Sequence, residues 1–244
     1  MEQKCSDLIT ILAPSKNEAE NLKILIEEIE TAMGAFSFEL LIIDDGSTDN
    51  TLELVTTMAQ SRSWLHCLSL SRSAGKSAAI REGIRRSTGS IIVTIDADGQ
   101  NNPAYIPELV QALDNQGSAV GLIGGQRLKR SDNWLKRKAS RIANKIRGSM
   151  LNDRTRDSGC GFLAIRRTAF ESLPYFDGRH RFMAALVLRE GYQIGHIDVI
   201  DRPRRYGESK YGIFDRGVKG TIDLLGVWWL LKRSPKPFSV EEIS

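Results

Sequence analysis

Acidic side chains follow two separate apolar segments of this chain, and their spacing suits cation binding. One segment ends in Asp44 and Asp45, and another is followed by Asp96 and Asp98, with Gln100 two residues further on. In extended backbone, residues i and i+2 point to the same side, so Asp96 and Asp98 can face one ligand together. Hard oxygen ligands suit Mg²⁺ or Mn²⁺, which take their other ligands from water and substrate phosphates. The second cluster therefore predicts a metal-assisted diphosphate site.

Helix capping is the alternative for the first acidic cluster. Asp and Ser are common at helix N-caps, so residues 44–49 could simply begin a helix. Packing alone, however, gives no reason to place mutually repelling carboxylates at the ends of two different strands. A ligand site accounts for both clusters together.

The elements that position these residues alternate regularly over the first hundred residues. Strands are expected at 8–13, 40–43, 64–70 and 91–95. A helix is expected over 22–33, a second with Leu52, Val55 and Met58 or Ala59 on one face, and a third over 78–86. Strands rich in Ile, Leu and Val that alternate with helices predict an α/β fold with a mostly parallel sheet and helices on both faces. Ligands bind beyond the carboxyl ends of such strands.

The second half of the chain is less regular. It predicts a helix over 103–113, strands at 119–123, 159–165 and 193–200, and a helix near 181–189. Residues 127–147 form a basic amphipathic segment with nine Lys and Arg and a single acid, Asp132. A solvated helix face is the usual fate of such charge, but this balance favours a membrane-facing role. The tail over 217–233 carries paired tryptophans and ends in basic residues, which is typical of an interfacial segment.

Composition limits the class of protein. The net charge of +4 and the pI near 9.0 indicate anionic partners without separating nucleic acid, phosphorylated molecules and acidic lipid. Cys5, Cys67 and Cys160 are far apart, so a reducing compartment is expected rather than a disulfide framework. The N-terminus does not resemble a signal peptide, and no apolar stretch reaches the roughly 18–20 residues of a membrane span. We expect a cytoplasmic protein, peripheral on the cytoplasmic face of the membrane.

A set of motifs in fixed order resembles the inverting glycosyltransferase family 2 with the GT-A fold. Within that family, the chain is most similar to the dolichol-phosphate mannose synthase type, the polyprenyl-phosphate glycosyltransferases. The resemblance extends from about residue 8 to about residue 215. It rests on residues 13–18, 43–49, 96–100 with Pro103, 125–127, 140–144, 157–162, 180–182 and 204–212.

The resemblance implies a role for each matching residue. The nucleotide-sugar site would comprise Pro14, Asn17, Glu18, Asp44, Asp45, Lys76, Asp96, Ala97 and Asp98. The metal, Mg²⁺ or Mn²⁺, would be held by Asp96, Asp98 and Gln100. The acceptor phosphate would be bound by Arg127, Lys136, Arg137, Ser140, Arg204, Ser209 and Lys210, the last three on a closing loop. The residues expected to matter most for catalysis are Asp96, Asp98, Asp157, Arg127 and Arg204.

Three positions depart from the pattern of the family. Lys16 replaces a residue that is often aromatic, so the base of the nucleotide stays open. Asn102 stands where an Asp is common. Lys136 replaces an expected Arg, which keeps the charge but loses the bidentate fork of a guanidinium.

The implied activity is transfer of mannose or another hexose, with inversion, from a GDP- or UDP-sugar to dolichyl or undecaprenyl phosphate. The product would be a lipid-linked sugar for a cell-envelope glycan or a lipid modification. Residues 1–215 would form the catalytic domain. Residues 216–244 would form an amphipathic extension that meets the membrane or a small membrane-protein partner.

Other classes of protein explain less. A family 2 enzyme with a soluble or glycan acceptor is the main alternative. A basic nucleic-acid-binding module would leave the acidic strand ends unexplained, so no nucleic-acid partner is expected. A dinucleotide dehydrogenase needs a Gly-x-Gly-x-x-Gly motif after a strand, which the sequence lacks.

Overall fold

The computed structural model describes residues 7–128, 147–153, 155, 160–203, 206 and 213–233, with the backbone alone for 213–219. The strands are β1 (Ile9–Ser15), β2 (Phe38–Asp44), β3 (Leu65–Ser69), β4 (Ile91–Thr94), β5 (Val120–Arg127), β6 (Leu163–Arg166) and β7 (Gln193–Val199). The α-helices are α1 (Ala19–Met33), α2 (Thr51–Ala59), α3 (Lys76–Arg86), α4 (Ile106–Asn115), α6 (Arg167–Ser172), α7 (Met183–Arg189) and α8 (Ile213–Lys232). Two short 3₁₀ helices are η1 (Pro103–Tyr105) and η2 (Arg179–Arg181).

The seven strands form one sheet in the order β3-β2-β1-β4-β6-β5-β7. Strands β3, β2, β1 and β4 pair in parallel, and so do β5 and β7. Strand β6 runs antiparallel to both of its neighbours, β4 and β5. The expected mostly parallel sheet is therefore confirmed, with β6 as its one reversed strand.

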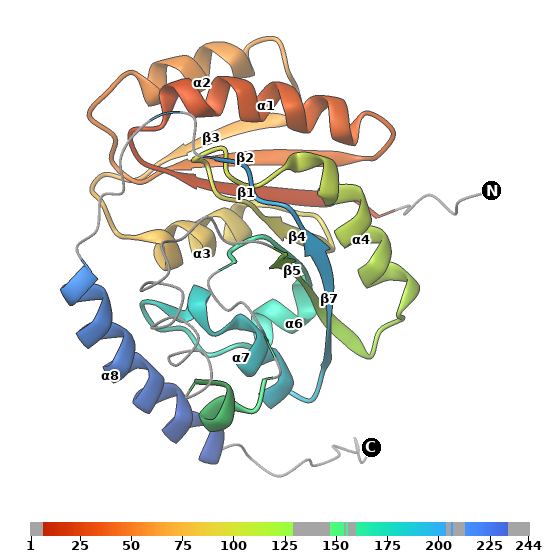
Figure 1. Cartoon of the computed structure of the whole chain (residues 1–244). Coiled ribbons are helices and arrows are strands. Elements are labelled where there is room, and N and C mark those ends of the chain that lie inside the picture. The colour runs from red at the N-terminus through yellow and green to blue at the C-terminus, as the bar shows by residue number, and fades with distance from the viewer. Residues whose placement is uncertain are drawn as a thin grey trace, which may run out of the picture.

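Helices cover both faces of the sheet, as the sequence predicts (Figure 1). Apolar side chains of α1, α2 and α4 pack on one face, and those of α3, α6, α7 and α8 pack on the other. Neighbouring residues of one strand belong to different layers: Ile11 of β1 faces the first helices and Leu12 faces the second. This division follows from the two-residue period of a strand. Because both faces are covered, the central strands are mostly apolar, with Thr10 of β1 and Thr94 of β4 as buried polar residues.

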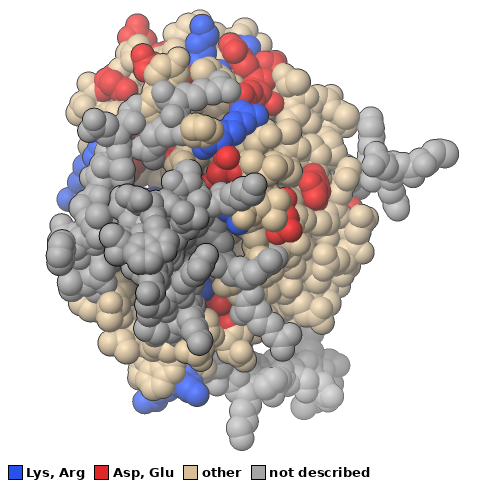
Figure 2. Space-filling model, viewed as in Figure 1, with Lys and Arg blue, Asp and Glu red and all other residues tan. Residues whose placement is uncertain are grey.

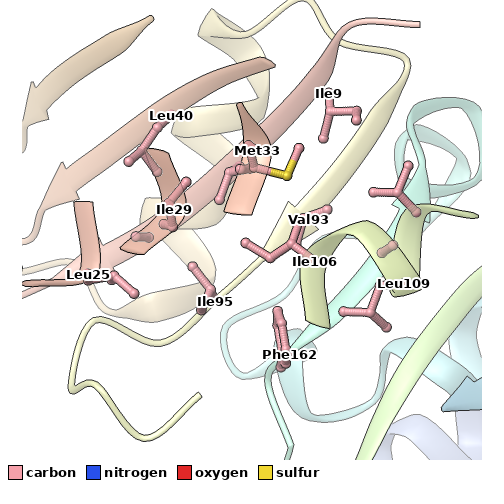
Figure 3. Packing of buried hydrophobic residues seen from close by; sticks show 14 of the residues in the cluster. Ile9, Leu25, Ile29, Met33, Leu40, Val93, Ile95, Ile106, Leu109 and Phe162 are labelled. Carbon is pink, nitrogen blue, oxygen red and sulfur yellow. The ribbon is translucent and has the colours of Figure 1, made fainter. Parts of the chain in front are cut away.

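The first layer is packed around the middle of the sheet (Figure 3). Ile29 and Met33 of α1 and Leu109 of α4 are fully buried against strand residues such as Ile9 and Val93. The helical spacing of the apolar residues in 22–33 predicts this face of α1 correctly. The packing fixes α1 and α4 on the strands that carry the acidic residues.

Three local expectations were wrong in detail. Leu52 is 41% exposed, and α2 buries Thr51 and Val55 instead. The strand expected at 119–123 continues to Arg127, so Arg127 belongs to β5 and not to the basic segment after it. The strand expected at 159–165 begins only at Leu163. Residues 129–146 of that basic segment lie outside the described residues.

Helix α8 packs on the second layer of the domain. Val227 is buried there, and Leu224, Leu230 and Leu231 pack against the same cluster. The expected boundary between 215 and 216 falls inside this helix, and the division into two parts stays a prediction. No helix in the described part of the chain is long and apolar enough to cross a membrane.

Truncating Leu109 is expected to test the packing of the first layer. Leu109→Ala should lower the free energy of unfolding by about 2–5 kcal/mol, because it leaves a cavity between α4 and the sheet. Urea denaturation followed by circular dichroism measures the change. Leu52→Ala is the control and should change stability by about 0.5 kcal/mol or less, since Leu52 is largely exposed. Similar losses in both variants would contradict this packing.

Candidate active site

The parallel strands bring the predicted donor residues to one edge of the sheet. Ser15 at the end of β1 pairs with Asp44 at the end of β2, and Leu12 pairs with Thr94 at the end of β4. The Asp45 N–H donates to the Ser15 carbonyl oxygen at 2.8 Å. The two acidic clusters therefore follow the strands on either side of β1, at the same edge of the sheet, as expected for an open parallel sheet.

Asp96 is held by a cation from another element. The ammonium of Lys76, the first residue of α3, bonds to the carboxylate of Asp96. Burial acts to raise the pKa of Asp96, but the charge and hydrogen bond of Lys76 outweigh it and lower the pKa overall. Gly161 leaves space for the pair, because a Cβ there would lie 2.5 Å from Lys76 Nζ. Asp96 is therefore an anion already matched to a positive charge.

His180 lies close to this ion pair as a neutral imidazole. Its Nδ1 is 2.8 Å from the Ser77 hydroxyl oxygen, which also accepts the N–H of Gly178 at 3.1 Å. Burial and the repulsion of Lys76 and Arg181 lower the pKa of His180 to about 3, although Asp96 acts to raise it. Near neutral pH, His180 therefore offers hydrogen bonds and no charge.

Asp98 and Gln100 occupy the turn that follows Asp96. The Gln100 N–H donates to Asp98 Oδ1 at 3.2 Å, and Gly99 adopts a positive φ of 72° that this turn requires. No cluster of three His, Cys, Asp or Glu side chains able to hold a metal occurs among the described residues. Two carboxylates and one amide oxygen fit Mg²⁺ or Mn²⁺, which take their remaining ligands from water or substrate phosphates.

The first acidic cluster joins loops and does not cap a helix. Asp44 accepts hydrogen bonds from the backbone N–H and the hydroxyl of Ser47. Asp45 accepts the N–H groups of Ala74, at 2.6 Å, and Gly75, and its other oxygen accepts the Ser73 hydroxyl.

Helix α2 begins with Asn50 in the N-cap position, which makes no side-chain cap. The Thr51 N–H instead bonds to Asp49. Capping therefore does not explain Asp44 and Asp45.

The turn after β1 is joined to the turn after β2. Asn17 has a positive φ of 53°, and its side-chain oxygen accepts the Thr48 N–H at 2.7 Å. Its own N–H donates to the Ser47 hydroxyl. Glu18 accepts a hydrogen bond from the amide of Asn21 at 2.7 Å. Pro14, Asn17 and Glu18 thus lie at the same edge as the acidic clusters, and their binding roles remain a proposal.

A buried hydrogen-bonded chain connects the Asp96 turn to Arg127. The Asp96 N–H donates to Asn101 Oδ1 at 3.1 Å, and the Asn101 amide donates to Asp201 Oδ1 at 3.3 Å. The other oxygen of Asp201 accepts Arg127 Nη1 at 3.3 Å. Asn101 is 5% exposed. No sequence motif marks Asn101 or Asp201 for this role, because the contact between them joins positions 100 residues apart.

Arg202 ties the chain that leads toward residues 204–212 to the same turn. Its N–H donates to the Gln100 carbonyl at 2.8 Å, and its guanidinium bonds to both carboxylate oxygens of Glu28. The guanidinium also donates to Asn102 Oδ1 at 2.6 Å, and Asn102 caps η1 through the Ala104 N–H. Asn102, where the family commonly has Asp, therefore has a structural role.

A hollow of about 40 Å³ lies beside His180 and is lined in part by Arg147, Arg181 and Thr155. Arg147 pairs with the buried Asp153 at 2.6 Å, and Arg181 pairs with Asp223 of α8 at 2.5 Å. Arg181 belongs to the family motif 180–182 and Arg147 to the basic segment, but neither arginine was predicted as a site residue. Larger open hollows, beside α1 and along β3, contain none of the predicted site residues.

Several predicted site residues lie outside the described part of the chain, and their roles stay predictions. They are Lys136, Arg137, Ser140, Asp157, Arg204, Ser209 and Lys210.

Comparison with known proteins defines the class of this chain. Residues 10–173 match the family model described as glycosyl transferase family 2. The match covers more than half of the chain, so the chain belongs to glycosyl transferase family 2. The resemblance found in the motifs is confirmed.

The more similar relatives include two undecaprenyl-phosphate 4-deoxy-4-formamido-L-arabinose transferases. The protein from Serratia proteamaculans is 31% identical over 208 residues, and the one from Yersinia enterocolitica is 33% identical over the same length. In both cases the alignment covers 84% of this chain and 63% of the relative. The chain thus spans less than two thirds of these relatives.

Solved structures of glucosyl-3-phosphoglycerate synthase from Mycobacterium tuberculosis share the fold. One, in complex with Mn²⁺, UDP-glucose and phosphoglyceric acid, aligns with a TM-score of 0.70 and 19% identity over 94% of this chain and 81% of that one. Another, with Mg²⁺ and UDP, gives a TM-score of 0.67 and 20% identity over 96% of this chain and 81% of that one. The expected GT-A fold is confirmed.

The protonation of His180 is a testable consequence of its surroundings. Because its pKa is lowered to about 3, the imidazole should remain neutral between about pH 5 and 8. Two-bond ¹H–¹⁵N correlation spectra of the folded protein should show one neutral tautomer throughout this range. A titration with a midpoint near the ordinary histidine value, about 6.5, would contradict the assigned environment.

Asn101 tests the connection between the Asp96 turn and Asp201. Asn101→Leu keeps the volume but removes the acceptor of the Asp96 N–H and the amide that donates to Asp201 Oδ1, so the free energy of unfolding should fall by about 1–3 kcal/mol. Urea denaturation measures the loss. Asn115→Leu, at the exposed end of α4, is the matched control and should have little effect. An unchanged stability for Asn101→Leu would contradict a stabilising role for this hydrogen-bonded chain.

Proposed function

We propose that this family 2 glycosyltransferase moves a sugar from a GDP- or UDP-linked donor onto a polyprenyl phosphate, with inversion at the anomeric carbon. The observation that carries the proposal is the Asp96–Asp98 turn, held against Lys76 at the end of β4. The relatives that transfer a sugar to undecaprenyl phosphate support the choice of acceptor. The product is a lipid-linked sugar for an envelope glycan or a lipid modification.

The donor lies along the carboxyl ends of β1, β2 and β4. Pro14, Asn17, Glu18, Asp44 and Asp45 contact the base and ribose, which suits their place on two joined turns. Lys76 and Asp96 contact the sugar and diphosphate, beside Ala97. Asp96, Asp98 and Gln100 would hold a divalent cation, which would supply Lewis-acid stabilisation of the diphosphate.

The acceptor needs alignment and charge neutralisation more than a strong base. A phosphate monoester has a second pKa near 6, so it is largely dianionic at neutral pH and is itself a nucleophile. The neutral state of His180 agrees with this requirement, because it can orient a hydroxyl or phosphate oxygen without taking up a proton. Arg127 provides positive charge on the acceptor side and is aligned by Asp201.

Other residues complete the acceptor side of this proposal. Lys136, Arg137, Ser140, Arg204, Ser209 and Lys210 contact the acceptor phosphate, and Asp157 contributes to catalysis. The reaction takes place at the cytoplasmic face of the membrane, with the enzyme bound peripherally. The sugar is mannose, another hexose or a modified pentose such as the one in the names of the relatives.

The described residues of one face of the molecule do not favour the nucleic-acid alternative. On the face shown in Figure 2, acidic and basic side chains of the described residues are interspersed over its upper part. A nucleic-acid site needs a continuous basic patch that can neutralise a row of phosphates. The described residues of this face do not form one.

An incorporation assay tests the proposal directly. Purified protein is incubated with a short-chain polyprenyl phosphate, Mg²⁺ or Mn²⁺, and a panel of GDP- and UDP-sugars, and labelled sugar is measured in the organic phase. One donor should be incorporated, and the product should have inverted stereochemistry. EDTA and Asp98→Asn should each reduce the rate by at least about 100-fold, because the diphosphate loses its main electrostatic stabilisation.

Different failures have different meanings in this assay. Metal-dependent release of nucleotide without labelled lipid would indicate a soluble or glycan acceptor, and would contradict the acceptor claim. A product with retained stereochemistry would contradict the one-step displacement. Asp114→Asn, which changes an exposed carboxylate in the last turn of α4, should retain full activity.

A further inference from the structure

Helix α8 has two apolar faces, and the domain covers only one of them. Val227 belongs to the buried cluster of the second layer, and Leu224, Leu230 and Leu231 pack against that cluster. On the other face the exposed fractions are 64% for Ile222, 53% for Leu225, 40% for Trp228 and 56% for Trp229. These four residues, the outer stripe of α8, form a continuous apolar surface.

The spacing of the outer stripe makes it a single face. Positions 222, 225 and 229 are related by i, i+3 and i+7, so they lie one above the other on the helix. Large apolar residues exposed elsewhere in the described chain belong to different elements, such as Leu52 on α2 and Leu188 on α7. Scattered residues of this kind need no explanation, whereas a contiguous patch marks an interaction site.

Basic residues next to the outer stripe indicate which kind of partner it binds. Lys232 and Arg233 follow the tryptophans at the end of the helix, and the Arg233 guanidinium lies 5.4 Å from the centre of the Trp229 ring. Asp223 is directed to the domain, where it pairs with Arg181 at 2.5 Å. The sequence has no acidic residue from 224 to 240. Tryptophan beside basic residues is the combination found at membrane–water interfaces.

We propose that the outer stripe of α8 docks on an anionic lipid bilayer, with the helix lying in the plane of the interface. A bilayer supplies both requirements of this face: an apolar layer for Ile222, Leu225 and the tryptophans, and anionic headgroups for Lys232 and Arg233. A second apolar protein surface would meet only the first requirement.

The docked surface lies next to the active site. Asp223 of α8 pairs with Arg181, and Arg181 adjoins His180 in the chain. His180 bonds to Ser77, which follows Lys76, the partner of Asp96. Docking therefore holds the active site close to the headgroups, where a polyprenyl phosphate presents its phosphate. This consequence for the acceptor rests on the proposed function, whereas docking itself does not.

Vesicle flotation tests the docking, using the whole chain. Wild-type protein should float with vesicles of phosphatidylcholine and phosphatidylglycerol, and less with phosphatidylcholine alone. Leu225→Ser/Trp229→Ser should bind the anionic vesicles at least about tenfold more weakly, because two apolar side chains no longer leave water. Leu52→Ser, which changes a comparably exposed residue on α2, should bind like the wild type. Circular dichroism and thermal melting verify that the variants fold.

Three outcomes would overturn the docking proposal. The first is no binding of the wild type to anionic vesicles. The second is equal binding by the Leu225→Ser/Trp229→Ser variant. The third is a wild-type protein that does not bind vesicles but forms dimers in sedimentation, with the dimers lost in the variant. That result would make the stripe an interface between two copies.

An activity comparison separates docking from the proposed reaction. With a short, water-soluble polyprenyl phosphate, the Leu225→Ser/Trp229→Ser variant should match the wild type. With undecaprenyl phosphate in vesicles it should be slower by a factor similar to its loss of binding. Vesicle binding without any transfer would support docking and contradict the reaction. If the variant transfers sugar in vesicles as fast as the wild type, the result would support the reaction and contradict docking.

Discussion

The ion pair between Asp96 and Lys76 is the constraint on which the site depends. A carboxylate at the end of a buried parallel strand needs a compensating charge, and the first residue of α3 supplies it. Gly161 lies opposite the pair, and a side chain there would displace the Lys76 ammonium from its present position. Ser77, the next residue of α3, then fixes His180. One helix start therefore sets both the charge and the polar lining of the site.

A second set of contacts connects the proposed donor side of the site to the proposed acceptor side. Asn101 and Asp201 connect the Asp96 turn to Arg127, and Arg202 anchors the chain that leads toward residues 204–212. In the proposed reaction, the donor lies on the first side and the acceptor on the second. Displacement requires the two phosphates to be aligned while their repulsion is neutralised. The part-buried hydrogen-bonded link between the two sides meets the geometric part of that requirement.

The fold was predicted well from the sequence where the spacing of apolar residues follows the period of a helix or a strand. Ile29 and Met33 mark the buried face of α1, and the apolar strands predict a sheet covered on both sides. The reversed direction of β6 was not predicted, because a short apolar strand has the same sequence pattern in either direction. Asp96 and Asp98 were found from spacing. Asn101, Asp201 and Arg202 were missed because their contacts form between segments about 100 residues apart, and only the folded chain places them together.

The central claim is that the end of β4 binds the donor through a divalent cation. Crystals grown with UDP and MnCl₂ and measured at a wavelength where manganese scatters anomalously test it most directly. The account predicts one strong anomalous peak at the Asp96–Gln100 turn, within coordination distance of Asp98 and of the UDP phosphates. A peak elsewhere in the molecule, with UDP bound away from β1, β2 and β4, would contradict it.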